Sequence, residues 1–551
     1  SLSATRTLTI APNTISRVMF IENATSGSQS IAISQGSGAN VTILTGKTAV
    51  VYLDGAGSGA AVVDAMLGVD PGVTDTLAEV LVAGSVTGGT DLSISIGDDF
   101  KTLTAGTSNL RLGVNAGNSI ESGGNYNVVV GDEAGTAITT GDGNVAVGYT
   151  SLQATTTGTL NAGLGHQALY TNTTGTNNTG VGTYALYANT TASNNTAVGF
   201  NSLLANTTGT QNTAVGASAG VALTTGSNNT AFGFEALKNE DAHGNNTAIG
   251  TQTLFAQNAG ADAYNTAVGY QAGAAVTTGV QNTFIGGLAG DSLTTGSYNV
   301  ALGGGALTND DVGSKTTAIG YDALSSQNYA TATDSYNTAV GHDAGKAVTT
   351  GIRNTLIGGL TGDALTDADN NIAMGYAALT SDTLGSGSVA LGAGALNAQN
   401  FTSATTSYNV AVGLDAGKSV TTGINNTLIG GLAGDAITTG GNSVAVGTAA
   451  LTSATTASDN VAVGVSSLQE NTTGHSNVAI SNNALLRNTT GTQNVAIGKT
   501  ALSYNTTASN NTAVGYASLL ANTTGAANVA LGANALDTNT TGANNVAIGF
   551  T

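Results

Sequence analysis

The pentad Asn195-Thr196-Ala197-Val198-Gly199 decides the fold, because it returns throughout most of the chain. It recurs 17 residues later as Asn212-Thr213-Ala214-Val215-Gly216, and units of this kind begin 26 times between residues 109 and 545. The consensus unit is N-T/V-A-V/I-G-x-x-A-L-x-x-N-T-T-G-x-x, in which the opening Asn is position 1. A short fixed period of this kind is typical of a solenoid, in which each repeat stacks on the one before it.

Each unit predicts one short strand bounded by tight corners. The second and fourth residues of the pentad point to one face and the third to the other, while Asn before it and Gly after it tolerate positive φ angles. The later T-T-G stretch, such as Thr207-Thr208-Gly209, is expected to form a second short strand. No window between corners is long enough for a helix, so each unit predicts one β-coil, with asparagine amides hydrogen-bonded along the stack. At ~4.8 Å per coil, the stack is a rod about 120 Å long.

Each complete unit has one large aliphatic side chain at either position 9 or position 12, and not at both. In 16 units position 9 is Leu and position 12 is small or polar; in 9 units position 9 is Gly and position 12 is a branched aliphatic residue. The simplest reason is that one large side chain fills one core volume in each coil, since two would overpack it and none would leave a cavity. The predicted core residues include Leu203, Leu237, Val276, Leu293, Ile437 and Leu519.

The composition excludes several classes of protein. The 551 residues include no cysteine, which rules out a disulfide framework and cysteine-ligated metals. A formal net charge of -20 argues against binding to nucleic acid, which needs clustered Lys and Arg. A hydrophobic content of 40% argues against disorder. No apolar run approaches the roughly 18 residues of a membrane span, so we expect no membrane insertion.

Residues 1–108 do not follow the repeat. Alternating segments there predict an antiparallel meander, either a small β-sandwich or a capping sheet; they are Thr5–Ala11, Arg17–Glu22, Ser30–Ser34, Val41–Leu44 and Ala49–Leu53. We assign residues 1–74 to an N-terminal β domain for attachment or capping, and residues 75–108 to a connector with a short helix at Asp75–Ala83. Residues 109–551 form the shaft. The predicted fold class is therefore all-β: a parallel β-solenoid or β-roll of about 26 coils with a small β-sandwich-like domain before it.

Three units exceed 17 residues by two or more, and their extra residues predict surface loops. The last two of these units start 72 residues apart, and each of the three precedes a pair of Gly-type units. Two interpretations remain open: bulges copied when a 72-residue block duplicated, or loops that contact a partner, since Tyr and Asn are common in recognition loops. The recognition candidates are Gln257, Asn258, Tyr264, Gln327, Asn328, Tyr336, Gln399, Asn400 and Tyr408.

Patterns that carry chemistry are sparse. The histidines lie in four different units, and the neighbours His342 and Asp343 would point apart on a strand. Asp363, Asp367 and Asp369 fall within one unit and are the candidate calcium ligands, with a solvated acidic corner as the alternative. We expect the same solvated corners at Glu240-Asp241 and at Asp310-Asp311. The sequence therefore predicts neither an enzyme nor a cofactor.

Three parts of the chain resemble fibre proteins. Asp75–Phe100, with Leu77-Ala78-Glu79-Val80-Leu81 followed by Thr87-Gly88-Gly89-Thr90-Asp91, resembles a segment near the start of tailed-phage fibre and tailspike proteins. Thr5–Val63 resembles the N-terminal region of marine and cyanobacterial phage structural fibres. The N-T-A-V-G…N-T-T-G array is similar to fibre shafts of that group and, more distantly, to the β-roll heads of trimeric autotransporter adhesins.

This resemblance implies a non-enzymatic structural fibre of a phage virion, a tail fibre or similar appendage that mediates host attachment. It implies a virion or extracellular location, self-association into a homotrimer or filament, attachment through residues 1–105 to a virion or surface protein, and a host-surface receptor. Such fibres often end in a cleavable chaperone domain; the sequence stops inside a unit at Phe550-Thr551, so we expect that a C-terminal part was removed or is absent. The alternatives are a bacterial extracellular adhesin or self-assembling filament, and a polysaccharide-depolymerising tailspike.

Overall fold

The computed structural model describes residues 4–12, 14, 16–24, 29–56, 61–64 and 106–550. The chain divides into two compact units, Ser1–Phe100 and Lys101–Thr551, and each is described by itself. The described residues form strands and turns without a helix, so none of them supplies an apolar helix of the length that a membrane span requires. The helix predicted at Asp75–Ala83, and most of the 75–108 connector, lie outside the described residues.

The N-terminal unit contains two three-stranded sheets. One has the order β1-β3-β4 and the other β2-β5-β6. The strands are β1 (Arg6–Thr9), β2 (Ser16–Glu22), β3 (Ile31–Ser34), β4 (Val41–Ile43), β5 (Thr48–Asp54) and β6 (Val62–Asp64). All five predicted segments coincide with β1 to β5, but the simple meander is wrong, because β1 pairs in parallel with β3 while β2 joins the other sheet.

Both N-terminal sheets contribute to one apolar cluster. Ile33 and Ile43 come from the first sheet, and Val51, Leu53 and Val62 come from the second. All five side chains are at most 2% exposed. Because two sheets share one core, the unit has the arrangement of a small β-sandwich.

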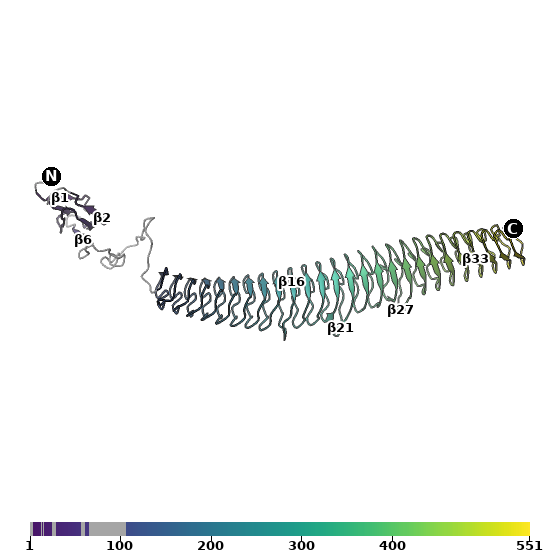
Figure 1. Ribbon diagram of the computed structural model, residues 1–551, viewed down its shortest axis with the longest axis horizontal. Coiled ribbons are helices and arrows are strands. Elements are labelled where there is room, and N and C mark those ends of the chain that lie inside the picture. Colours follow the sequence, from purple (N-terminus) through teal and green to yellow (C-terminus); the bar gives the residue numbers. More distant parts are fainter. Residues whose placement is uncertain are drawn as a thin grey trace. The chain divides into compact units, whose positions relative to one another are not determined.

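The shaft is one continuous parallel sheet of 26 three-residue strands, which occupy positions 2 to 4 of successive coils (Figure 1). Equivalent residues stand in register, as in Thr196↔Thr213. The strands are β7 (Leu110–Leu112), β8 (Val128–Val130), β9 (Val145–Val147), β10 (Ala162–Leu164), β11 (Thr179–Val181), β12 (Thr196–Val198), β13 (Thr213–Val215), β14 (Thr230–Phe232), β15 (Thr247–Ile249), β16 (Thr266–Val268), β17 (Thr283–Ile285), β18 (Val300–Leu302), β20 (Thr317–Ile319), β22 (Thr338–Val340), β23 (Thr355–Ile357), β24 (Ile372–Met374), β26 (Val389–Leu391), β28 (Val410–Val412), β29 (Thr427–Ile429), β30 (Val444–Val446), β31 (Val461–Val463), β32 (Val478–Ile480), β33 (Val495–Ile497), β34 (Thr512–Val514), β35 (Val529–Leu531) and β36 (Val546–Ile548). The predicted β-solenoid is thereby confirmed.

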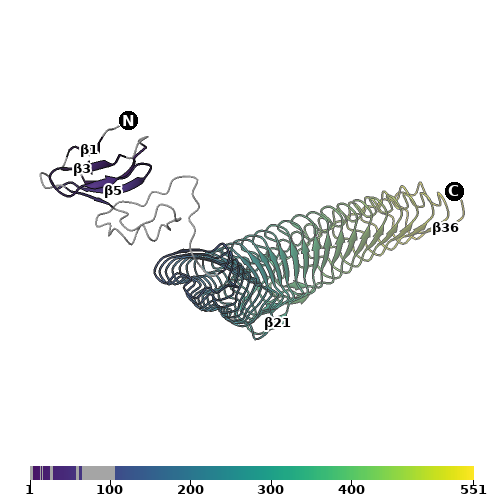
Figure 2. The same ribbon diagram turned by 60° about the vertical axis from the view of Figure 1, so that its left-hand side comes forward.

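The predicted second strand at T-T-G is wrong for the regular coils. Residues such as Thr207 form bends whose backbone still bonds to the next coil, with Thr207 N donating to Thr224 O at 2.8 Å. In this part of the coil, strand pairing occurs only at two of the longer coils among the described residues. There β19 (Gly313–Ser314) pairs with β21 (Thr333–Asp334), and β25 (Gly385–Ser386) pairs with β27 (Thr405–Thr406), both in parallel. Figure 2 shows the loop at β21 standing out from the even outline of the shaft.

The position 1 asparagines form the predicted ladder. Asn212 N donates to Asn195 Oδ1 at 2.9 Å, and Asn212 Nδ2 donates to Gly226 O at 2.8 Å within its own coil. Glycine closes every pentad but one, where Ser481 stands, and it is favoured there by the lack of space as well as by the backbone angle. Gly199 has a φ of +138°, and a Cβ there would lie 2.4 Å from Gly216 O of the next coil. The pentads therefore stack with their backbones in direct contact.

The interior confirms the exchange between positions 9 and 12. All six predicted core residues are 0% exposed: Leu203, Leu237, Val276, Leu293, Ile437 and Leu519. A third position completes the rule. Phe284 stands at position 3, where most coils have Ala, and a Cβ on either Gly273 or Gly290 would lie within 2.8 Å of its ring. Two successive glycines at position 9 therefore make room for one bulky side chain at position 3.

Candidate functional surfaces and the turn at Glu240

The three longer coils place their glutamines in the interior, at position 12. Gln327 Nε2 donates to Asp310 Oδ2 of the preceding coil at 2.7 Å, and Gln399 Nε2 donates to Asp382 Oδ2 at 2.6 Å. Together with Gln257, they are 0% exposed. The prediction that the three glutamines contact a partner is therefore wrong, because their buried side chains cannot reach one.

The asparagine and tyrosine candidates are exposed but occupy regular positions of the coil. Asn258, Asn328 and Asn400 each donate a backbone N–H to a threonine carbonyl of the next coil at 3.0 Å. The tyrosines directly precede the next Asn, and Tyr126 and Tyr298 occupy the same place in coils without a long loop. The side chains of Tyr264, Tyr336 and Tyr408 are 56%, 52% and 65% exposed.

Two of the loops are anchored by buried aromatic side chains. Tyr329 is 4% exposed and its hydroxyl donates to Gly351 O at 2.9 Å, while Phe401 is 5% exposed. Burial raises the pKa of the Tyr329 phenol above its ordinary range, so the hydroxyl remains a donor at any physiological pH. These two loops are packed onto the shaft, and their exposed residues are held at fixed places along it.

The candidate calcium ligands do not come together. Asp363 accepts a hydrogen bond from Thr380 Oγ1, Asp367 accepts one from Thr350 Oγ1 at 2.6 Å, and Asp369 accepts one from Ile352 N at 2.7 Å. Each carboxylate thus bonds to an adjacent coil. Within the described residues, only one group of three His, Asp or Glu side chains has its ligand atoms in mutual reach, and it contains none of these three aspartates.

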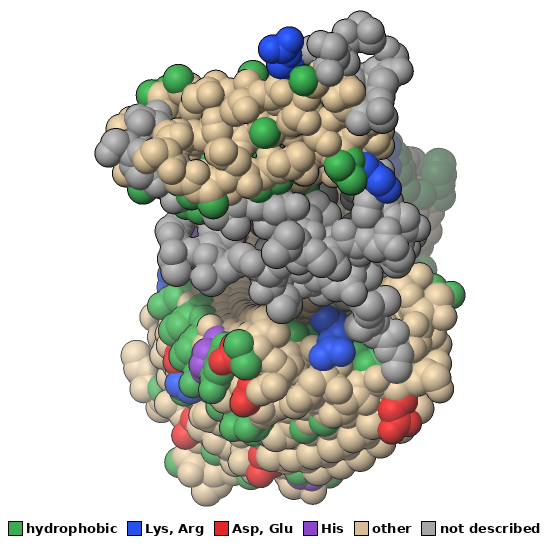
Figure 3. Space-filling view, turned by 90° about the vertical axis from the view of Figure 1, so that its left-hand side faces the viewer, with side chains coloured by type: hydrophobic (Ala, Val, Ile, Leu, Met, Phe, Trp, Pro, Cys, Tyr) green, Lys and Arg blue, Asp and Glu red, His purple; other side chains and the backbone are tan. Residues whose placement is uncertain are grey.

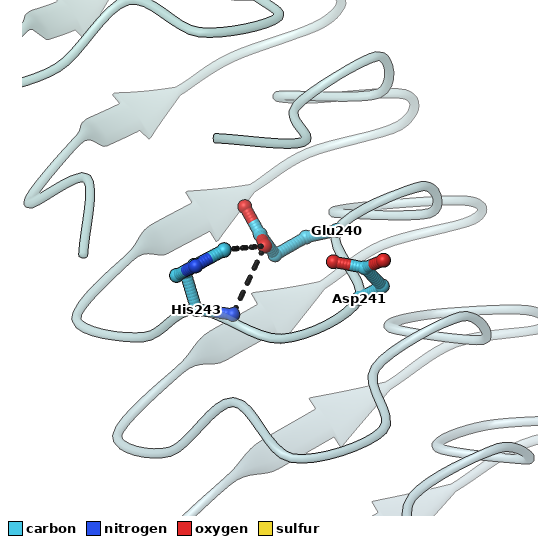
Figure 4. Close-up of side chains that lie close together, drawn as sticks. All are labelled: Glu240, Asp241 and His243. Atoms are coloured by element: carbon cyan, nitrogen blue, oxygen red, sulfur yellow. Dashed lines mark hydrogen bonds and ion pairs between the residues drawn. The ribbon is translucent and has the colours of Figure 1, made fainter. Parts of the chain in front are cut away.

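That group is the turn formed by Glu240, Asp241 and His243, whose ligand atoms all lie within 4.8 Å of one another. The sequence predicts a solvated acidic corner here, and this prediction is wrong, because Glu240 is 0% exposed at position 12. His243 N donates to Glu240 Oε1 at 3.1 Å, and His243 Nδ1 lies 3.4 Å from the same oxygen (Figure 4). Burial raises the pKa of the Glu240 carboxyl above its usual range.

Asp310 repeats this arrangement one block later, and its assignment to a solvated corner is also wrong. Its side chain is 0% exposed and accepts from Gly313 N at 2.9 Å as well as from Gln327. Burial is the main cause that raises the pKa of Asp310. The adjacent Asp311 also has a buried oxygen, Oδ1, without a hydrogen-bond partner. Position 12 therefore carries buried acids as well as core aliphatics.

The expectation that His342 and Asp343 point apart is wrong as well. His342 Nδ1 lies 3.4 Å from Asp343 Oδ2, because the two residues belong to the turn after a strand, where Asp343 has a φ of 56°. The pair is open to water, with His342 64% exposed, and Lys346 Nζ lies 3.1 Å from the same carboxylate. The pair belongs to a solvated surface network.

An aromatic cluster on the shaft surface was missed by the sequence analysis. The Tyr170 and Tyr187 rings are stacked with centroids 5.1 Å apart, and His166 stacks on Tyr149 at 5.4 Å. Tyr184 connects these pairs, because it makes edge contacts with His166 and with Tyr187. The 17-residue spacing of Tyr149 and His166, and of Tyr170 and Tyr187, was the available signal, since residues one period apart stack directly.

The outer face of the long sheet carries an unbroken apolar column at position 4, next to a position 2 column that contains threonine in 12 of the 26 coils. Position 4 is aliphatic in 24 of the 26 coils and is Phe232 or Met374 in the other two; neither position 2 nor position 4 carries a charge anywhere. Exposed fractions reach 54% at Phe232 and 44% at Met374. In the end-on view, hydrophobic side chains gather on one side of the shaft, with some acidic, basic and histidine side chains among them (Figure 3). We call the position 2 and position 4 side chains of β7 to β36 the outer strand face.

Comparisons with known proteins give no identification: no family model matches the chain, and neither curated proteins nor solved structures give a significant match.

Proposed function

We propose that the protein is a non-enzymatic structural fibre, the self-associating shaft of a phage virion appendage that mediates host attachment. The observation that carries this proposal is the outer strand face. A parallel sheet ordinarily has both of its faces covered by other elements, whereas the position 4 column of this parallel sheet is apolar and partly exposed. Contiguous exposed apolar surface marks an interaction site. A rigid rod with such a face is suited to bundling with further copies of itself.

A second copy of the same chain fits this face better than a globular partner does. The face extends over 26 strands of three residues, which corresponds to roughly 120 Å by 10 Å, or about 1,200 Å² on each copy. A stable interface needs about 800 Å² per partner. Only a partner with the same coil spacing can match the position 4 side chains along the whole length. A homotrimer would bury the face of each copy.

Self-association is tested by sedimentation of the full chain. We expect a trimer, and we expect monomers when Ile429, Val446 and Val463 of three successive coils are replaced by Glu. The matched control places the same three charges on exposed threonines of the same coils, Thr439, Thr456 and Thr473, and should leave the trimer intact. A wild-type chain that sediments as a monomer would contradict this proposal.

The location on a virion is tested by immunogold electron microscopy. An antibody against the shaft is expected to label an appendage of purified phage particles from the source material. Labelling of phage-free bacterial cells would favour the bacterial adhesin or filament instead. The depolymerising spike makes a third, separate prediction: new reducing ends when the protein is incubated with host polysaccharide.

Host contact requires exposed side chains at fixed places on the rod, and two groups of residues provide them. The aromatic cluster around Tyr184 offers several ring faces in adjacent coils. The tyrosines of the longer coils recur along the shaft, and Tyr336 is held by Lys315, whose Nζ lies 3.1 Å from its hydroxyl and 5.1 Å from its ring centroid. We propose these two groups as the receptor-contact residues of the shaft.

A further inference from the structure

We propose that the turn of Glu240, Asp241 and His243 binds a divalent first-row transition-metal ion such as Zn²⁺. Three residues of one coil depart from the repeat here: Glu240 replaces Asn at position 12, Asp241 replaces Thr at position 13, and His243 replaces Gly at position 15. All three replacements introduce metal-ligating side chains. Imidazole and carboxylate donors in one set suit a transition-metal ion better than Ca²⁺, which prefers oxygen ligands alone.

The distances in the turn fit a metal better than a hydrogen bond. His243 Nδ1 lies 3.4 Å from Glu240 Oε1, yet this buried nitrogen has no hydrogen-bond partner. Two ligands at about 2.0–2.1 Å from a tetrahedral zinc ion stand roughly 3.3 Å apart, so the observed separation is that of two atoms on one ion. Asp241 has its carboxylate within 4.8 Å of both and is partly exposed, so its side chain is free to rotate onto the ion (Figure 4).

The glutamine of the next coil supplies a second, independent observation. In the two equivalent places the glutamine amide donates to the buried acid, from Gln327 to Asp310 and from Gln399 to Asp382. Gln257 is equally buried, but its Nε2 has no partner. The Glu240 carboxylate therefore lacks the side-chain amide donor that Asp310 and Asp382 have, which leaves it available to a metal ion. A water on the open fourth coordination position would be the acceptor that Gln257 Nε2 lacks.

The fold explains why a histidine is tolerated here. In the preceding coil, a Cβ on Gly226 would lie 2.3 Å from His243 O, because the coils are in contact at position 15. The next coil has a longer loop at this place and does not follow the regular course of the backbone. Residues of this loop form hydrogen bonds with the turn of Glu240. Glu240 Oε2 accepts from Ala259 N at 3.5 Å, and Asp262 Oδ1 accepts from Gly244 N at 2.8 Å. A metal ion at Glu240 would thus fix the base of this loop.

The site is tested by titrating the tag-free full chain with Zn²⁺ in a calorimeter at pH 7.5, and by the visible spectrum of bound Co²⁺. We expect one site per chain. His243→Gly restores the residue found at Gly226 and should weaken binding at least tenfold, as should Asp241→Thr, which restores the residue found at Thr224. The matched control is His342→Tyr, which copies Tyr270 of the preceding block and should bind like the wild type.

Because both site variants restore repeat residues, they should fold, and thermal melting without metal checks that they do. The proposal is overturned if the wild type binds no Zn²⁺, or if His243→Gly binds Zn²⁺ as tightly as the wild type. It is equally overturned if His342→Tyr removes the site.

Discussion

The coils from residue 460 to 544 and those from 265 to 442 fill their cores with side chains from different positions of the repeat. In the first stretch, position 9 is always Leu, in a left-handed conformation such as the φ of 49° at Leu519. In the second stretch, coils occur in pairs with Gly at position 9, as at Gly273 and Gly290. A non-glycine residue in this conformation costs about 1–2 kcal/mol. The regular stretch accepts that cost in every coil, whereas the Gly pairs avoid it.

The compensation in the regular stretch lies at position 12. With Leu at position 9, position 12 is free for asparagine, and these asparagines form a second, internal ladder. Asn488 Nδ2 donates to Asn471 Oδ1 at 2.7 Å, and Asn505 Nδ2 donates to Asn488 Oδ1 at 2.9 Å. In a Gly pair an aliphatic side chain occupies position 12 instead and interrupts this ladder. The comparison shows one core built either from strained leucines with a polar ladder or from relaxed glycines with larger apolar side chains.

The largest expected effect comes from the bulky residue between paired glycines. Phe284→Ala should destabilise the surrounding coils by about 3–5 kcal/mol, because the cavity it leaves has no other side chain to fill it. Gly290→Leu should also destabilise them, by about 1–3 kcal/mol or more, since a Cβ there would lie 2.5 Å from the Phe284 ring. The measurement is hydrogen exchange of residues 265–315, together with urea unfolding.

The double variant is the sharper test of the comparison. In Phe284→Ala with Gly290→Leu, the new side chain enters the volume that the ring leaves, while Leu293 stays at position 12. The double variant should therefore recover only part of the loss, which gives a favourable coupling of about 0.5–3 kcal/mol. The control is Gly287→Ala in the same coil, whose new methyl group would meet nothing within 4 Å. Strictly additive losses in the double variant would show that Phe284 and position 9 do not share one volume.

Much of the core could be predicted from the sequence. The features that could not be predicted depend on contacts between successive coils. The exchange of Leu203-type and Val276-type residues between positions 9 and 12 is visible within single units, so it was found. The role of Phe284 was missed because its space comes from two successive coils. The buried acids Glu240 and Asp310 were missed because an acidic pair in a turn resembles a solvated corner. Their burial depends on stacking and on the longer loop of the following coil.

The surface was less accessible to prediction than the interior. The sequence identified which units carry extra residues, but Gln327 and Gln399 belong to the interior column rather than to the loops. The reason is that the register within a long unit is set by tertiary contacts, such as the bond from Gln399 to Asp382. The outer strand face was present in the sequence as alternation at positions 2 and 4. Recognising it as unusual required the knowledge that no other element of the described chain covers it.

A moderate loss of stability is expected when a substitution interrupts the asparagine ladder at position 12 of the regular stretch. Asn488→Ala removes the acceptor used by Asn505 and both donors of its own amide, one of which bonds to Gly491 O at 2.9 Å. Because buried polar partners are left unsatisfied, we expect a loss of about 1–3 kcal/mol, measured by urea unfolding and by hydrogen exchange of residues 471–522. Thr490→Ala, an exposed change in the same coil, is the control. Equal effects of the two substitutions would mean that the ladder contributes nothing to stability.

The smallest expected effect is on how stability depends on pH. It differs between the two stretches because position 12 holds different residues in them. The regular stretch holds neutral asparagines there, whereas the other holds Asp310, whose pKa burial raises above the value near 3.9 of an unfolded chain. Between those two pKa values the folded state binds more protons than the unfolded state. The contribution of Asp310 to stability is therefore present below the unfolded pKa and is lost as the pH rises through the folded pKa.

Replacing Asp310 by Asn should remove this dependence, because an amide keeps an oxygen acceptor for Gly313 N, as Asn539 does for Gly542 N at 3.1 Å. We expect the melting temperature of Asp310→Asn to exceed that of the wild type by a margin that grows from pH 4 to pH 7. Asp132→Asn removes the same charge from an exposed position and corrects for the net charge of -20. A margin that stays constant or shrinks with pH would mean that Gln327 and the backbone donors stabilise the carboxylate more than burial penalises it. In that case the acid at position 12 would be a better core residue than the asparagine of the regular stretch.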